Sequence, residues 1–110
     1  MGGRGAAALA RVDAGSLEEL MAAYPAEWRA VGEALVAATA AGRPEAVEAF
    51  VRQAAEAAAP WRARVERSHG NPEVLAAALP RLAAARMARL AVERTRSEEH
   101  TSELQSHSGI

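Results

Sequence analysis

The chain has 110 residues, which limits it to one small domain, and its formal net charge is −1. It contains no cysteine, so disulfides and thiolate metal sites are excluded, and no apolar run approaches the roughly 18 to 20 residues that a membrane-spanning helix needs. Alanine accounts for 30 residues and buries little area, so we expect a small core that depends on a few larger side chains.

The N-terminal segment, residues 1–15, begins with Gly and Ala. Arg11 and Asp13 interrupt its apolar residues before they form the hydrophobic part of a signal peptide. The Gly-rich start follows no strand pattern, so it does not predict a phosphate-binding loop. We expect a flexible or frayed N-terminus over residues 1–15 and, without a signal peptide or a membrane span, a cytoplasmic protein.

Helical signals dominate residues 16–95. Ser16 followed by Glu19 is a capping-box pattern that predicts the start of a helix. Pro25 suits the first turn of a second helix, and Gly42 with Pro44 separates that helix from a third.

The second half of the helical region contains one further break and two internal prolines. Gly70 is expected to end one helix, Asn71 to cap the next, and Pro72 to take its first position. Pro60 and Pro80 fall inside apolar stripes, where each removes a backbone donor. We therefore expect bends there or, in the case of Pro60, two helices meeting near Ala59.

Larger apolar residues recur every three or four positions, which is the spacing of one helix face. No alternating strand pattern competes with it. The sequence therefore predicts an all-α fold, a small antiparallel bundle of about four Ala-rich helices with Pro bends. Trp28 and Trp61 lie on the stripes, which favours core packing over stacking on a ligand. The predicted core is Leu17, Leu20, Tyr24, Trp28, Val31, Leu35, Val47, Phe50, Val51, Trp61, Leu75, Leu79 and Leu82.

Few residues before the last 14 suggest chemistry. No metalloprotease, nucleotide-binding or nucleophile-elbow motif is present. His69 is a candidate base or ligand, but it has no partner at a useful spacing, and a polar residue near a helix C-terminus explains it more simply. We predict no catalytic residue, no metal site and no cofactor.

Charge is distributed unevenly along the chain. Residues 1–61 contain five Arg and eight acids, whereas residues 62–96 contain eight Arg and three acids. An arginine stripe of this kind can contact phosphates, but it lacks interleaved aromatics and a helix-turn-helix pattern. A solvated face, or pairing with the acidic half or with missing sequence, is therefore favoured over nucleic-acid binding. The candidate binding residues are Arg62, Arg64, Arg67, His69, Arg86 and Arg89.

The stretch PWRARVERSHGNPEVLAAALPRL resembles the ligand-binding (FCD) domain of GntR-type transcription regulators. It shares an aromatic residue, a short amphipathic segment, a Gly-Asn-Pro turn and a Leu-rich helix. In that family a metal-binding His follows the aromatic residue and an Asp precedes it by three positions. Arg62 and Ala58 occupy those positions here, so the resemblance implies a ligand-binding helical domain without the usual metal ligands.

The composition changes abruptly after Arg96. Residues 97–110 contain no Ala and no Arg, but they hold four of the six Ser residues. The string RSEEHTSELQS, residues 96–106, resembles the translation of a widely used short-read sequencing adapter over eleven consecutive residues. The resemblance implies an artefactual tail, residues 96–110, on a truncated reading frame. We expect this tail to lie outside the core, with Leu104 exposed, and we give its His and Glu residues no role as ligands.

Two classes of function remain open. The favoured class is a non-enzymatic helical interaction or regulatory module, binding a protein partner, a second copy or a regulatory ligand. The alternative is a helical segment of a larger enzyme. A pocket that encloses His69 and several arginines would favour the enzyme, whereas an exposed apolar seam would favour the interaction module.

Overall fold

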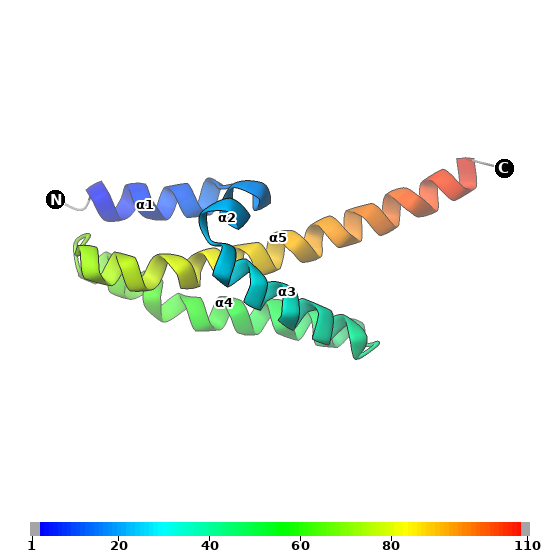
Figure 1. Ribbon diagram of the computed structural model, residues 1–110, viewed down its shortest axis with the longest axis horizontal. Coiled ribbons are helices and arrows are strands. Elements are labelled where there is room, and N and C mark those ends of the chain that lie inside the picture. The colour runs from blue at the N-terminus through cyan, green and yellow to red at the C-terminus, as the bar shows by residue number, and fades with distance from the viewer. Residues whose placement is uncertain (1–2, 109–110) are drawn as a thin grey trace.

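The computed structural model describes the backbone of residues 3–108 and the side chains of residues 5–97. Residues 3–108 form five helices and no strand: α1 (Gly3–Ala14), α2 (Leu17–Ala23), α3 (Pro25–Ala40), α4 (Pro44–Arg67) and α5 (Pro72–Ser108). The predicted all-α fold is therefore confirmed, and the expected number of about four helices is close to that observed (Figure 1).

The helix boundaries follow the capping and proline signals. Ser16 and Glu19 form a complete capping box, in which Ser16 Oγ accepts from the Glu19 amide at 3.2 Å and the Glu19 carboxylate accepts from the Ser16 amide at 3.1 Å. Pro25, Pro44 and Pro72 each begin a helix, where the missing N–H has no intrahelical partner to lose.

The two longer turns contain left-handed backbone. Gly42 has a φ of 71° between α3 and α4, and Gly70 has a φ of 83° between α4 and α5. His69 also has a positive φ, 54°, which is uncommon outside glycine. Asn71 then caps α5, because its side-chain oxygen accepts from the Glu73 amide at 2.8 Å.

The helices α4 and α5 run without interruption through their internal prolines. The alternative of two helices meeting near Ala59 is therefore wrong. Ala58 and Val65, which lie before and after Pro60, are both buried, so tertiary packing on either side holds a single helix despite the lost backbone hydrogen bond.

The N-terminal segment differs from the sequence-based expectation. Residues 3–14 form helix α1, so the predicted flexible or frayed segment over residues 1–15 is wrong for these residues. Leu9 and Val12 are buried on one face of α1. A Cβ on Gly5 would lie 3.3 Å from the Cα of Gly70, so glycine allows α1 to approach the α4–α5 turn closely.

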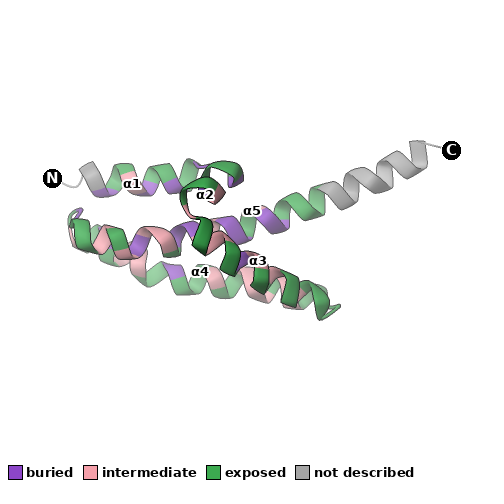
Figure 2. Ribbon diagram, viewed as in Figure 1, coloured by how far each residue is buried: buried purple, intermediate pink, exposed green. Residues whose placement is uncertain are grey.

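Helix α5 lies at the centre of the bundle and contacts each of the other four helices (Figure 1). Residues 78–92 of α5 include buried positions on several sides of the helix, whereas α3 and α4 are buried along one side only (Figure 2). The buried core is Leu9, Val12, Leu17, Leu20, Val31, Ala58, Val65, Ala78, Leu82, Ala83, Met87, Ala88, Ala91 and Val92.

The predicted core residues all lie on inward or half-buried faces. Leu17, Leu20, Val31 and Leu82 are buried, and the other nine are half-buried, including both Trp residues. The list of predicted core residues did not include the buried alanines of α5. Buried alanines on α5 allow neighbouring helices to approach closely, so α5 fills the centre with little side-chain volume.

The C-terminal part of α5 extends past the other helices (Figure 1). The helix continues through residue 96, so the backbone of residues 97–108 is helical. The predicted exposure of Leu104 and the predicted absence of the tail from the core concern side chains outside the described residues.

Candidate functional site

A groove of about 400 Å³ lies between α4 and α5 and includes Asp13 of α1. Its lining combines an alanine-rich floor with charged side chains from three helices. We call it the arginine groove, and it is lined by Asp13, Val51, Ala55, Ala58, Ala59, Arg62, Ala63, Glu66, Leu82, Ala85, Arg86 and Arg89.

Helical spacing brings these side chains together. On α4, Val51, Ala55, Ala58, Arg62 and Glu66 recur every three or four residues and therefore share one face. The lining residues of α5, which fall within residues 82–89, also lie on one helix face. The small side chains of the floor leave the space that the longer arginines surround.

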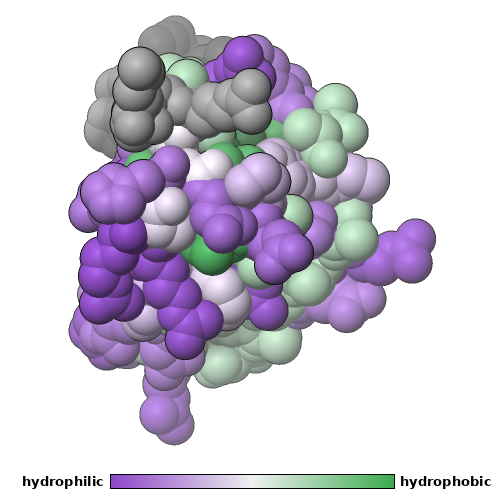
Figure 3. Space-filling view, turned by 90° about the vertical axis from the view of Figure 1, so that its left-hand side faces the viewer, coloured by the Kyte–Doolittle hydropathy of each residue, from purple (hydrophilic) through white to green (hydrophobic). Residues whose placement is uncertain are grey.

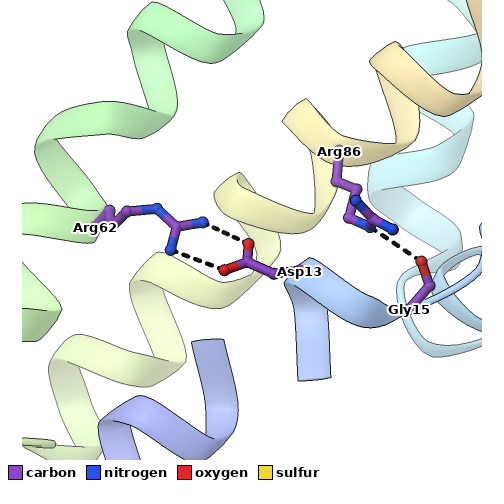
Figure 4. Close-up of polar contacts among 4 residues, drawn as sticks. All are labelled: Asp13, Gly15, Arg62 and Arg86. Atoms are coloured by element: carbon purple, nitrogen blue, oxygen red, sulfur yellow. Dashed lines mark hydrogen bonds and ion pairs between the residues drawn. The ribbon is translucent and has the colours of Figure 1, made fainter. Parts of the chain in front are cut away.

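Two arginines of the groove bind oxygen atoms of the α1–α2 region (Figure 4). Arg62 donates hydrogen bonds to the Asp13 carboxylate from both terminal nitrogens, at 3.0 Å from Nη1 to Oδ2 and 2.6 Å from Nη2 to Oδ1. Arg86 Nε donates to the Gly15 carbonyl oxygen at 3.0 Å. The end of α1 is therefore attached to both walls of the groove.

Gly15 is required at the junction between α1 and α2. A Cβ at this position would meet the Arg11 carbonyl oxygen at 3.0 Å and the Leu20 side chain at 3.3 Å. Because the residue is buried and lacks a side chain, its carbonyl can face Arg86 without displacing either neighbour.

The electrostatics of the groove favour a carboxylate. The hydrogen bond from Arg62 lowers the pKa of Asp13 below its ordinary value of 3.8, and the positive charges of Arg62, Arg86 and Arg89 act in the same direction. Partial burial opposes this shift without reversing it. The same contact raises the pKa of Arg62, so both groups are charged at neutral pH.

The charges that line the groove sum to +1. Arg62, Arg86 and Arg89 contribute +3, and Asp13 and Glu66 contribute −2. Arg89 also forms an exposed ion pair of 3.7 Å with Glu93, one turn further along α5. A bound monoanion would therefore neutralise the groove.

The structure separates the six candidate binding residues predicted from the sequence. Arg62, Arg86 and Arg89 meet in the arginine groove. Arg64 instead lies over the Trp61 ring, with its guanidinium carbon 4.5 Å from the ring centroid, and Arg81 stacks on the same ring at 4.3 Å.

Arg67 and His69 do not line the groove. Both are exposed at the end of α4 and in the α4–α5 turn. The end of the molecule that carries this turn is largely hydrophilic, with a small apolar area between the charged side chains (Figure 3). His69 therefore does not share a site with the three arginines of the groove.

Three ion pairs connect the basic half of the sequence to its acidic half. They join Arg62 to Asp13, Arg94 to Glu18, and Arg96 to Glu48, the last at 3.5 Å. Pairing with the acidic half, one of the interpretations favoured by the sequence, thus accounts for part of the arginine stripe.

The described side chains contain no group of three or more His, Cys, Asp or Glu residues able to hold a metal ion. Within the same part of the chain, no helix combines the length and the apolar character needed to cross a membrane.

No family model, no curated protein sequence and no solved structure matches this chain.

The sequence did not reveal Asp13, which lines the groove, or Gly15, which accepts the hydrogen bond from Arg86. Asp13 lies 49 residues from Arg62, and Gly15 lies 71 residues from Arg86. Local periodicity carries no information on such distant pairs. An acid next to a Gly-Ser helix junction was the available local signal, and it points only to a helix start.

Proposed function

We propose that the chain is a non-enzymatic regulatory module that binds a small organic anion in the arginine groove. The observation that supports this function is the meeting of Arg62, Arg86 and Arg89 above an alanine floor. The cavity size, about 400 Å³, lies within the usual range for small-molecule sites.

The residues of the groove favour binding over catalysis. Its lining has no Ser, Thr, Cys, His or Lys, so it offers neither a common nucleophile nor a base with a pKa near neutrality. His69, which would have supported the enzyme alternative, lies in the α4–α5 turn.

Nucleic-acid binding is a weaker proposal for the same arginines. Arg62, Arg94 and Arg96 each lie against an acid of the first half, which opposes contact with phosphates. A protein partner or a second copy needs a larger surface than this groove supplies. We propose a cytoplasmic site of action, where small organic anions are plentiful.

Titration calorimetry with octanoate tests this function. We expect saturable binding of one octanoate per chain and at least a tenfold loss of affinity in Arg62→Gln, since hydrogen bonds to charged groups contribute about 1.5–3 kcal/mol. Arg64→Gln is the matched control, because Arg64 stacks on Trp61 outside the groove. Absence of binding to the wild-type chain, or equal losses in the two variants, would overturn the proposal.

A further inference from the structure

We propose that Asp13 occupies the ligand position of the arginine groove as an internal carboxylate, and that the incoming ligand is a monocarboxylate with an apolar body that takes its place on Arg62. This inference rests on the proposed function and names the ligand class and the regulation of the same site.

The contact between Asp13 and Arg62 shows which group the groove accepts. The carboxylate receives two parallel N–H···O bonds, at 3.0 and 2.6 Å, which is the geometry that arginine offers to a carboxylate. A monocarboxylate reproduces this two-oxygen contact and replaces the single negative charge of Asp13, so the net charge of the groove lining stays at +1 after the exchange.

The internal contact is replaceable. The Arg62 and Asp13 side chains are 40% and 51% exposed, so water reaches both, and ion pairs at this exposure contribute little to stability. An incoming carboxylate therefore exchanges one weak ion pair for another and gains burial of its apolar body in addition.

The alanine-rich floor of the groove determines the size of the apolar part of the ligand. Small alanines from α4 with Leu82 and Ala85 from α5 leave a shallow apolar surface beside the guanidinium groups. A short unbranched chain fits this surface, whereas acetate covers none of it. Octanoate therefore serves as the probe, with acetate and octanol as ligands that lack one of its two parts.

Ligand exchange has a structural consequence at α1. Asp13 is the penultimate residue of α1, and its bond to Arg62 is one of two polar attachments of the α1–α2 junction to the groove. Replacing Asp13 by a ligand releases that attachment while Arg86 keeps the Gly15 carbonyl. The number of polar attachments that hold the end of α1 therefore depends on whether the groove is occupied.

The test compares octanoate affinity in the wild-type chain, Asp13→Asn, Asp13→Glu and Glu66→Gln. Removing the internal competitor in Asp13→Asn is expected to raise affinity two- to fivefold, which corresponds to an exposed ion pair of about 0.5–1 kcal/mol. Asp13→Glu keeps a competing carboxylate and should bind like wild type. Glu66→Gln removes the other negative charge of the groove without freeing Arg62 and should gain less than Asp13→Asn.

The outcomes separate this inference from the proposed function. Octanoate binding that is equal in wild type and Asp13→Asn, or a gain in Glu66→Gln as large as in Asp13→Asn, overturns the competition by Asp13 but leaves the groove as a ligand site. Failure of both the wild-type chain and Asp13→Asn to bind octanoate overturns both. Octanol affinity that rises in Asp13→Asn as much as octanoate affinity also contradicts an exchange of carboxylates.

Discussion

The arginines of α4 and α5 form two groups that differ in what they contact. Arg62 and Arg86 bind oxygen atoms of the α1–α2 region and line a groove, whereas Arg64 and Arg81 lie over the Trp61 ring. Both groups take one residue from each of the same two helices. The neighbouring element, and not the residue type, therefore decides whether an arginine stacks on an aromatic ring or hydrogen-bonds to the α1–α2 region.

The largest expected effect concerns the group around Trp61. Replacing Trp61 with Ala removes a half-buried indole and the platform of two guanidinium groups, so we expect about 2–3 kcal/mol of destabilisation in urea unfolding. Octanoate affinity should stay unchanged once the variant is folded. Trp61→Phe, which keeps an aromatic ring, should lose less than half as much; a loss below about 0.5 kcal/mol in Trp61→Ala would refute a stabilising role.

The next effect separates two arginines of the groove. Arg86→Gln removes a charged donor from the Gly15 carbonyl and should destabilise the chain by about 1.5 kcal/mol in urea unfolding. Arg89→Gln is the control, because its 3.7 Å pair with Glu93 lies on one exposed helix face and contributes about 0.5 kcal/mol or less. Equal losses in the two variants would show that the bond to Gly15 does not anchor α1.

A smaller effect depends on pH. The folded-state pKa of Asp13 is lowered by Arg62, so its contribution to stability is present above the unfolded pKa and is lost as pH falls through the folded pKa. Wild type should exceed Asp13→Asn by about 0.2–1 kcal/mol near pH 7, and the two should converge below pH 3.8, the ordinary pKa of aspartate. Thermal unfolding at several pH values measures this difference; a gap that is constant down to pH 2 would contradict the ion pair.

The smallest expected effect is that of the adapter-like tail. A chain that ends after Arg96 keeps the ion pair between Arg96 and Glu48 and all of the buried core. We expect its unfolding free energy to match that of the full chain within about 0.5 kcal/mol. Loss of a cooperative transition in thermal unfolding would show that residues 97–110 are structural and would overturn the interpretation of the tail as an artefact.

The sequence predicted the features that local chemistry determines. Pro25, Pro44 and Pro72 begin helices where expected, and the Ser16–Glu19 capping box is present with both of its hydrogen bonds. The signals were short and depended on residues at most a few positions apart, which is the range over which capping and backbone restriction act.

The arginine groove required information from distant parts of the chain. Arg62, Arg86 and Arg89 were predicted as candidate binding residues together with three others that lie elsewhere, because charge along the sequence does not specify helix face or neighbour. Helix α1 was missed because its short stripe, Leu9 and Val12, is embedded in Gly and Ala. Without α1, neither the internal carboxylate nor the groove it borders was predictable.

The most direct test of the groove as a ligand site is the nitrogen-15 NMR spectrum of the arginine Nε–H groups during an octanoate titration of the full chain. We predict that the Arg62 signal shifts and saturates, because the ligand replaces Asp13 on this guanidinium group, whereas the Arg86 signal shifts less, because its Nε–H keeps the bond to the Gly15 carbonyl. The Arg64 and Arg81 signals should remain in place, because both guanidinium groups lie over Trp61. Equal shifts of all four signals, or no saturable shift of Arg62, would contradict the account.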